Sequence, residues 1–348
     1  MTTPAASMPA AAPPTPERDA LERWIAGRDL ARVEMESLFG RLMDGAISPV
    51  YQAALLAALA AKGETVGEIA GAAAAMRARA ISIPHHRENV VDTCGTGGDG
   101  AGTFNISTAA ALVAAAAGVP MAKHGNRSVS SRCGSADVLE ALGVAVQVTP
   151  ESAARALDEI GIAFLFAPSL HPAMKEVMPV RRELGVRTLF NLLGPLVNPA
   201  GARRQVLGVP QPRWVEAHAA VLAELGCDHA LVVHGDGLDE ITTTGTTAVA
   251  EVRGGRIARY EVKPEDFGIA RARREELAGG DIAHNAGTML RVLRGEPGPL
   301  RDIVALNAGG AIYVGGLTQS LAAGVARAIT VLAEGGGLTK LEALRARA

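Results

Sequence analysis

The sequence has few aromatic residues, few cysteines and almost no net charge. Phe, Trp and Tyr make up 3% of the 348 residues, which leaves few platforms for stacking single-stranded bases. The 34 basic and 36 acidic side chains nearly cancel, so we expect no general attraction for nucleic acid or for an anionic membrane. Cys94, Cys133 and Cys227 form no C-x-x-C pair, and we infer a reducing compartment.

Long apolar runs are also missing. No apolar stretch reaches membrane-spanning length without polar interruption. The first 17 residues are rich in Ala, Pro and Thr and lack a basic start, so we predict a disordered tail and no signal peptide. The chain length suits about two domains. We therefore expect a cytoplasmic protein of two domains.

The residue pattern changes from helical to alternating at about residue 85. Over residues 18–85, Ser48-Pro49 is typical of a helix start and Thr65 with Glu68 forms a capping-box pattern, so a small helical domain is predicted. β-Favouring segments then alternate with helices, near 89–92, 119–123, 144–148, 162–167, 204–209 and 229–234. A hairpin is predicted at Gly254-Gly255, and helices follow. This alternation predicts an α/β domain with a mostly parallel central sheet, over residues 86–171 and 197–348.

A glycine-rich loop, GTGGDG at residues 95–100, follows the first β-favouring segment. It matches the G-x-G-x-x-G pattern of dinucleotide-binding folds. Two features count against that interpretation. The stretch about twenty residues on, GVPMAK at 118–123, lacks the acid that would bind ribose, and Asp99 inside the loop would repel a bare pyrophosphate. An acid beside phosphate makes sense when Mg²⁺ lies between them.

Two polar clusters follow this loop. Asn105 to Thr108 precede an apolar run that ends at Gly118, so a helix is predicted with its amino end, an anion-binding feature, directed into the loop. The alternative is that these polar groups only cap the helix. KHGNRSVSS at 123–131 follows the next predicted strand, and Lys123 there suits a phosphate. The alternative for this cluster is a solvated polar loop.

Further charged residues occur in the second half of the chain. The stretch from His171 to Pro199 predicts a helical insertion, near 172–196, that returns to the first helical domain and carries Arg181, Arg182 and Arg187. For Arg182 and Arg187 we favour solvated positions on a surface helix. Asp239-Glu240 follows a predicted strand end, and paired carboxylates there suit Mg²⁺, although surface acids are more common.

Taken together, these motifs resemble the anthranilate phosphoribosyltransferase family. The resemblance covers about residues 18 to 345 and rests on GTGGDG (95–100), NIST (105–108), KHGNRSVSS (123–131), HPAMK…VRRELGVRTLFNLLGPLVNP (171–199) and GLDE (237–240). It implies a helical domain plus an α/β domain of the nucleoside phosphorylase type, in a homodimer joined through the helical parts. It also implies attack of the anthranilate amine on C1 of phosphoribosyl pyrophosphate (PRPP), a step of tryptophan biosynthesis.

The resemblance further implies a role for individual residues. PRPP is expected to contact Gly95, Gly98, Asp99, Thr103, Asn105, Ile106, Ser107, Thr108, Lys123, His124, Gly125, Asn126, Arg127, Ser128, Val129, Ser130, Ser131 and Ser135. Anthranilate is expected to contact Gly95, Asn126 and Arg181. Ser107, Asp239 and Glu240 are the implied ligands of Mg²⁺, with two ions per active site. No general base is identified. The alternatives are a pyrimidine nucleoside phosphorylase, which needs no metal-bound pyrophosphate, and a non-catalytic nucleic-acid-binding relative, which should have a basic surface.

Overall fold

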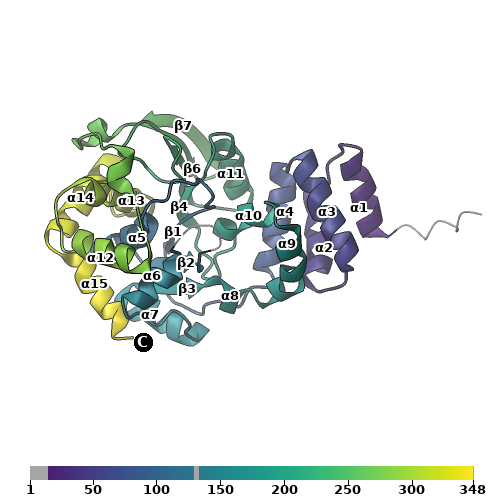
Figure 1. The fold of residues 1–348 in the computed structure, drawn as a ribbon, viewed down its shortest axis with the longest axis horizontal. Helices are drawn as coiled ribbons and strands as arrows, with labels where there is room; N and C mark the ends of the chain where they lie inside the picture. Colours follow the sequence, from purple (N-terminus) through teal and green to yellow (C-terminus); the bar gives the residue numbers. More distant parts are fainter. Residues whose placement is uncertain (1–14, 129–132, 348) are drawn as a thin grey trace, which may run out of the picture.

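The computed structural model describes residues 15–128 and 133–347. Its amino-terminal part is a group of four helices: α1 (Pro16–Ile25), α2 (Arg32–Met43), α3 (Pro49–Lys62) and α4 (Val66–Arg77) (Figure 1). The side chains of Ser48 and Thr65 accept hydrogen bonds from the first turns of α3 and α4, which confirms both predicted helix starts. The predicted tail is wrong at residues 16 and 17, because Thr15 caps α1 directly before them. Residues 1–14 of that tail lie outside the described residues.

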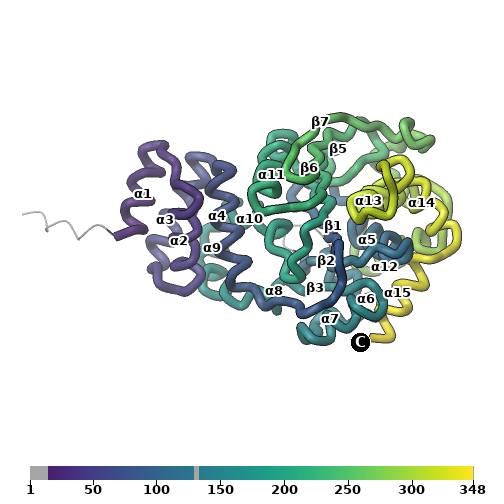
Figure 2. Tube along the Cα trace, turned by 180° about the vertical axis from the view of Figure 1, so that it is seen from behind, coloured from purple at the N-terminus to yellow at the C-terminus, as the bar shows by residue number. Residues whose placement is uncertain are grey.

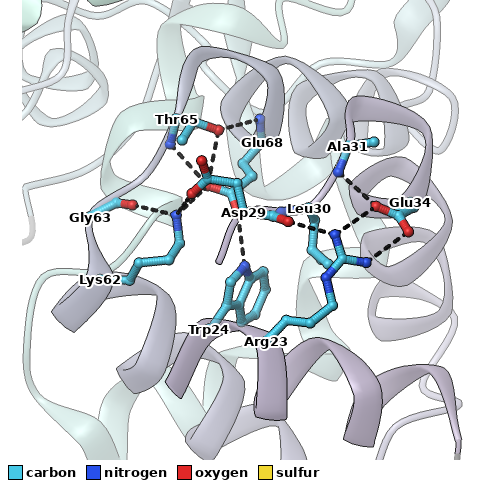
Figure 3. Close-up of polar contacts among 10 residues, drawn as sticks. All are labelled: Arg23, Trp24, Asp29, Leu30, Ala31, Glu34, Lys62, Gly63, Thr65 and Glu68. Atoms are coloured by element: carbon cyan, nitrogen blue, oxygen red, sulfur yellow. Dashed lines mark hydrogen bonds and ion pairs between the residues drawn. The ribbon is translucent and has the colours of Figure 1, made fainter. Parts of the chain in front are cut away.

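Glu68 holds these helices together from the inside. Its buried carboxylate accepts hydrogen bonds from Trp24 Nε1 at 2.7 Å and from the Leu30 backbone at 3.1 Å. Lys62 Nζ lies 2.9 Å from the same carboxylate and 2.6 Å from Asp29. Figure 3 shows these contacts converging on one point. Because the buried charge is paired and hydrogen-bonded several times, it fixes α1, α3 and α4 relative to one another.

The larger part contains a seven-stranded sheet in the order β3-β2-β1-β4-β5-β6-β7. The strands are β1 (Val91–Gly95), β2 (Met121–Gly125), β3 (Ile162–Phe166), β4 (Arg204–Gly208), β5 (His229–Gly235), β6 (Thr247–Arg253) and β7 (Arg256–Val262). The first five run parallel, and β6 and β7 form the predicted antiparallel hairpin at one edge. The predicted mostly parallel sheet is confirmed.

One predicted strand, residues 144–148, is wrong. These residues form an irregular link between α6 (Ser135–Ala141) and α7 (Pro150–Ile160). Val144 and Val146 are buried while the residues between and beside them are exposed, which reproduces the two-residue period of a strand. Both edges of β2 are already paired, with β1 and β3, so the segment has no place beside it in the sheet.

Helices cover both faces of the sheet. One face packs against α5 (Ile106–Ala117), α12 (Ile282–Leu293), α13 (Pro299–Val314), α14 (Leu321–Ala333) and α15 (Gly336–Arg345) (Figures 1 and 2). The other face packs against α11 (Arg213–Glu224) and shares one hydrophobic core with α2 to α4. Among the described residues, no single helix is long and apolar enough to cross a membrane; α14 and α15 reach that length and composition only as a pair bent by 70°. The short elements outside these layers are α8 (Ala167–Leu170), η3 (Pro264–Phe267) and η4 (Arg274–Leu277).

The segment between β3 and β4 lies beside the first helices. It contains η1 (Pro172–Glu176), α9 (Met178–Leu184), α10 (Phe190–Leu193) and η2 (Gly194–Leu196). η1 packs against α2, α9 against α3 and α10 against α4. In Figure 1, α10 lies between α4 and the sheet. The domain boundaries at residues 85 and 197 stay a prediction.

Candidate active site

The strand order of the sheet reverses between β1 and β4. The chain continues from β1 to β2 on one side and from β4 to β5 on the other. Gly95 and Gly208 end the two central strands and pair in register. In doubly wound sheets, ligands bind at this point, outside the carboxyl ends of the strands. The glycine-rich loop begins here, as the sequence pattern predicts.

The loop needs its glycines for backbone conformation. Gly97 and Gly98 have φ angles of 65° and 83°, which side chains disfavour. The helix α5 then begins at Ile106 and ends, as predicted, at a left-handed Gly118. The Asn105 side chain does not cap it and donates instead to the Cys133 carbonyl at 3.1 Å. The amino end of α5 is therefore not closed by the predicted cap, and its backbone N–H groups suit an anion.

Asp239 reaches into this loop from the segment after β5. The Gly97 backbone N–H donates to Asp239 Oδ2 at 3.0 Å, and the Asp239 backbone N–H donates to Asp99 Oδ2 at 3.4 Å. Gly95 makes room for this approach, since a Cβ there would overlap Asp239 Oδ2. Gly208 does the same, because a Cβ there would overlap the Asp239 carbonyl. The two predicted acidic motifs are thus brought together by two strand-end glycines.

The acids of this cluster raise one another's proton affinity. Burial, and then the neighbouring Asp99, raise the pKa of Asp239 to about 7. Burial and the charge of Asp239 raise the pKa of Glu240 well above its ordinary value, while Lys123 opposes the shift. Like charges this close destabilise one another unless a cation lies between them. The electrostatics of the cluster therefore favour a bound cation.

The predicted ligands of Mg²⁺ lie near one another and fit a divalent cation. The backbone N–H of Ser107, at the start of α5, donates to the Glu240 carboxylate. Within the described ranges, no three His, Cys, Asp or Glu side chains converge to enclose a metal ion by themselves. Mg²⁺ is commonly held by one or two carboxylates plus substrate phosphates. This donor set suits an ion whose remaining ligands come from a phosphorylated substrate.

Lys123 lies beneath the loop and is buried. Its ammonium group donates to the Thr93 carbonyl and, at 3.3 Å, to Ser107 Oγ. The fully buried Asp92 lies nearby, where it accepts from Asn198 Nδ2 at 2.8 Å. Burial raises the pKa of Asp92, and Lys123 opposes that rise. Lys123 thus supplies a fixed positive charge under the site, and its direct contact with phosphate stays a prediction.

His124 points away from the glycine loop, toward the helical insertion. Its Nδ1 lies 3.3 Å from the Gly194 carbonyl, and its Nε2 lies 3.2 Å from Nε2 of His171. Burial, followed by the adjacent His171, lowers the pKa of His124 to about 3, and burial lowers that of His171 to about 4. Two neutral imidazoles can share one proton between facing nitrogens, one as donor and one as acceptor. The contact between His124 and His171 was not predicted, because a histidine before a proline carries no signal by itself.

The cluster after β2 is bound to α6 in its described part. Arg127 lies 3.1 Å from Asp137 and 2.5 Å from Glu140, and these hydrogen bonds raise its pKa. The Ser128 backbone N–H donates to Asp137 at 3.1 Å. The Asn126 carbonyl accepts from Ser135 Oγ at 3.2 Å. Ser135 is the first residue of α6. Val129, Ser130 and Ser131 lie outside the described residues.

The remaining predicted PRPP contacts lie along the start of α5. Thr103 pairs with Ala278 in an isolated bridge, which ties the glycine loop to the segment after η4. Ile106 and Thr108 are both buried. The buried Thr108 hydroxyl has no hydrogen-bond partner in the described chain. Of the predicted site residues, Gly98, Asn126 and Arg127 are exposed, and Ser107, Asp239 and Glu240 are half-buried.

Two arginines of the helical insertion have different partners, one within the insertion and one in the glycine loop. Arg181 on α9 lies over the Phe190 ring, with its guanidinium 4.8 Å from the ring centroid, and burial lowers its pKa. Arg187 Nη2 donates to the Gly97 carbonyl at 3.3 Å, and its guanidinium covers Gly98 so closely that a Cβ there would overlap it. Arg187 is exposed, as predicted, but it lies outside the predicted surface helix and contacts the glycine loop, which was not predicted. The contact depends on how the insertion folds back over the loop, which no local pattern indicates.

Comparison with known proteins agrees with this arrangement. Residues 18–80 match the family model described as glycosyl transferase family, helical bundle domain, and residues 87–338 match the one described as glycosyl transferase family, a/b domain. The fold and the site therefore define a two-part glycosyl transferase. Anthranilate phosphoribosyltransferase of Anaeromyxobacter sp. (strain K) is 55% identical over 94% of this chain and 97% of that protein. The chain belongs to the anthranilate phosphoribosyltransferase family.

Solved structures of similar proteins have the same fold. The anthranilate phosphoribosyltransferase of Thermus thermophilus has a TM-score of 0.90 and 50% identity, over 94% of this chain and 99% of that one. The Saccharomyces cerevisiae enzyme, solved in complex with PRPP and Mg, has a TM-score of 0.84 at 24% identity, over 95% of this chain and 97% of that one. At 24% identity, the second comparison shows only that a distant relative shares the fold.

Proposed function

We propose that this protein transfers the phosphoribosyl group of PRPP to the amine of anthranilate, giving N-(5-phosphoribosyl)anthranilate and pyrophosphate. One observation carries the proposal: the Asp239 carboxylate is hydrogen-bonded into a glycine-rich loop that already contains Asp99. Acids in a phosphate-binding loop need a cation, and PRPP carries a pyrophosphate that binds Mg²⁺. The curated relatives at 52–55% identity are named for the same reaction.

The glycine loop and the start of α5 would hold the phosphates of PRPP. The proposed contacts are those named above, with Lys123 as a cation beneath the loop. Arg187, which covers Gly98, adds a positive charge beside the loop. Backbone N–H groups and fixed cations stabilise charge that develops on a leaving group without reorganising during the reaction.

Ser107, Asp239 and Glu240 would hold Mg²⁺, with two ions per site. Bound Mg²⁺ would neutralise the charge that builds on pyrophosphate as it leaves. The raised pKa of Asp239 and of Glu240 supports this role, since a cation restores both groups to their ionised form. The residues themselves position the leaving group and exclude water from it.

The acceptor would bind on the side of the helical insertion. The half-buried guanidinium of Arg181 lies on the Phe190 ring and pairs with no carboxylate of the described chain. The anthranilate carboxylate can therefore form an ion pair with it. Asn126 and Gly95 are the other proposed contacts. The amine nitrogen forms a bond to C1 as the C1–O bond to pyrophosphate breaks, and the nitrogen then loses a proton. An aromatic amine is a weak nucleophile, so positioning supplies much of the rate.

We also propose a homodimer joined through the helical part. Ile25, Val33 and Val50 of α1 to α3 have 73%, 72% and 79% of their surface exposed. Large apolar side chains that gather on one part of a surface mark interaction sites. Sedimentation of the full chain would test this, and a monomer at micromolar concentration would contradict it.

The deciding experiment follows the loss of anthranilate fluorescence with PRPP, with and without Mg²⁺. We expect turnover that requires both PRPP and the metal. The pyrimidine nucleoside phosphorylase alternative predicts phosphorolysis of thymidine with phosphate alone. Activity on thymidine together with no loss of anthranilate would contradict the proposal. Nucleic-acid binding is opposed by the balanced net charge of −2.

A further inference from the structure

A cavity of about 180 Å³ lies at the amino ends of β4 and β5, whereas the candidate active site lies at the carboxyl ends of the strands. Arg204 and His229, which line it, are the first residues of β4 and β5, whereas the glycine loop lies at the carboxyl ends of the parallel strands. Tyr313, near the end of α13, and Thr318, in the loop after it, close the cavity. Polar atoms make up most of its lining. The cavity is therefore separate from the proposed PRPP site.

Arg204 presents one unused edge of its guanidinium. Its Nη1 donates to the Val314 carbonyl at 2.6 Å, which fixes the side chain at the end of α13. Its Nε is buried and has no hydrogen-bond partner in the part of the chain that the structure describes. The Nε–Nη2 edge of a guanidinium is one of the two edges that bind a carboxylate or phosphate through paired hydrogen bonds. A buried donor without an acceptor is costly, and a small shift of the side chain would let this edge meet a ligand in the cavity.

The nearest acid is already satisfied by other groups. Glu251 lies 2.8 Å from His229 Nε2 and accepts from the hydroxyl of Tyr313 at 2.8 Å. The Tyr260 hydroxyl donates to its other oxygen at 2.9 Å. These contacts lower the pKa of Glu251 against the effect of burial. Its two oxygens are thus occupied by His229 and the two tyrosine hydroxyls, and within the described chain it forms no ion pair with Arg204 or Arg253.

The acid that lines the cavity, Asp228, is paired as well. Asp228 pairs with Arg203 at 2.8 Å. Arg253 reaches the Tyr313 hydroxyl, and neither it nor Arg204 forms an ion pair with an acid of residues 15–128 or 133–347. We propose that this cavity binds a small oxyanion, a phosphate or carboxylate group, between Arg204 and Arg253. Its small size and polar lining exclude a large aromatic ligand.

The helix α13 connects this cavity to the loop that carries Asp239. At its far end Val314 accepts from Arg204, and in its middle Asn307 exchanges two hydrogen bonds with the backbone of Ile241, both at 2.9 Å. Ile241 directly follows Glu240. A ligand that tightens the end of α13 therefore acts on a rigid element that also holds the proposed metal-binding loop.

Calorimetric titration of the full chain tests the proposal. PRPP with Mg²⁺, in the absence of anthranilate, is titrated first to fill the active site, and this step reports separately on the proposed function. Inorganic phosphate is then added, and malonate in a second arm, to tell a phosphate site from a carboxylate site. We expect a further saturable binding event for at least one of the two probes. If neither probe gives a saturable binding event in the PRPP-saturated protein, the proposal is wrong.

Variants assign the event to the cavity. Arg253→Gln removes an exposed charge and is expected to weaken probe binding by about tenfold or more, the loss of one charge-assisted hydrogen bond. Arg204→Gln should weaken it further, although it also removes the contact with Val314. Arg256→Gln, an exposed charge on β7 outside the cavity lining, serves as the control. Equal binding in Arg253→Gln and Arg256→Gln would contradict the assignment.

Discussion

The carboxylate of Asp239 accepts a hydrogen bond from the backbone N–H of Gly97 at 3.0 Å, across 142 residues of sequence. This contact places an acid inside a loop whose other features suit phosphate. Asp99 lies close enough to raise the pKa of Asp239, so the loop is strained electrostatically without a cation. The relationship links the two acidic motifs into one site.

Gly95 should not tolerate a side chain. A Cβ at this position would overlap Asp239 Oδ2 and lie 2.9 Å from its Cγ, so Gly95→Ala must displace the acid. We expect kcat/KM to fall by roughly 10²-fold, the effect of misplacing a catalytic group by about an ångström. Gly287→Ala, in α12 with nothing near its added Cβ, is the matched control and should keep full activity. Steady-state kinetics would decide, and a fully active Gly95→Ala variant would contradict the geometry.

The acid pair should be needed for metal use and not for folding. The double variant Asp239→Asn, Glu240→Gln keeps the size of both side chains and removes two mutually repelling charges. We expect the Mg²⁺ concentration for half-maximal PRPP turnover to rise by more than about tenfold, the loss of a carboxylate ligand. The Tm should stay the same or rise. An unchanged metal response in a folded double variant would remove these residues from the metal site.

Much of the fold follows from local sequence signals. Thr65 with Glu68, the end of α5 at Gly118 and the parallel strands before each polar cluster were predicted, because capping and strand periodicity act over a few residues. The false strand at 144–148 arose from the same periodicity, since alternating burial does not require a strand partner. Local patterns thus identify elements well and strand pairing less well.

Contacts between distant segments could not be predicted in the same way. Asn105 was expected to cap α5, but its side chain is drawn to the Cys133 carbonyl by the folding of the next loop. Arg187 is exposed as expected, but its contact with Gly97 was not predicted, because only the tertiary fold brings the two residues together. The neutral pair of His124 and His171 likewise depends on the insertion packing against β2. Each of these requires knowledge of which segments meet.

Arg187 should affect the use of PRPP more than that of anthranilate. Its guanidinium covers Gly98 and donates to Gly97, so it lies beside the proposed phosphate loop. We expect Arg187→Ala to raise the KM for PRPP by about tenfold, the loss of one charge-assisted hydrogen bond. Arg182→Ala, an exposed neighbour on α9, is the control and should change neither KM. If both variants behave alike, the contact has no role in substrate binding.

Arg181 should affect the acceptor instead. Its guanidinium is held over Phe190 and lacks an acidic partner in the described chain, which leaves its hydrogen-bonding edge for a carboxylate. We expect Arg181→Ala to raise the apparent KM for anthranilate by roughly 10- to 100-fold, with a smaller effect on that for PRPP. Arg181→Lys should not restore binding, since it cannot form the two-pronged contact. Equal changes for both substrates would refute the assignment.

Buried histidines should make the protein less stable in mild acid, and His218 on α11 offers a clean measure away from the polar clusters of the site. Burial lowers the pKa of His218 to about 4, whereas an unfolded histidine has a pKa of about 6.5. The unfolded state therefore binds more protons between these values, so the stabilisation is complete above about pH 6.5 and is lost as the pH falls toward 4. At pH 5 the expected loss from this one residue is about 2 kcal/mol.

Chemical unfolding of wild type and His218→Gln at pH 7.5 and pH 5 measures the difference, and other titrating groups cancel between the two proteins. His218→Gln should lose less stability on acidification than wild type, even if it starts lower; an equal or larger loss would show that His218 is not held neutral in the folded state.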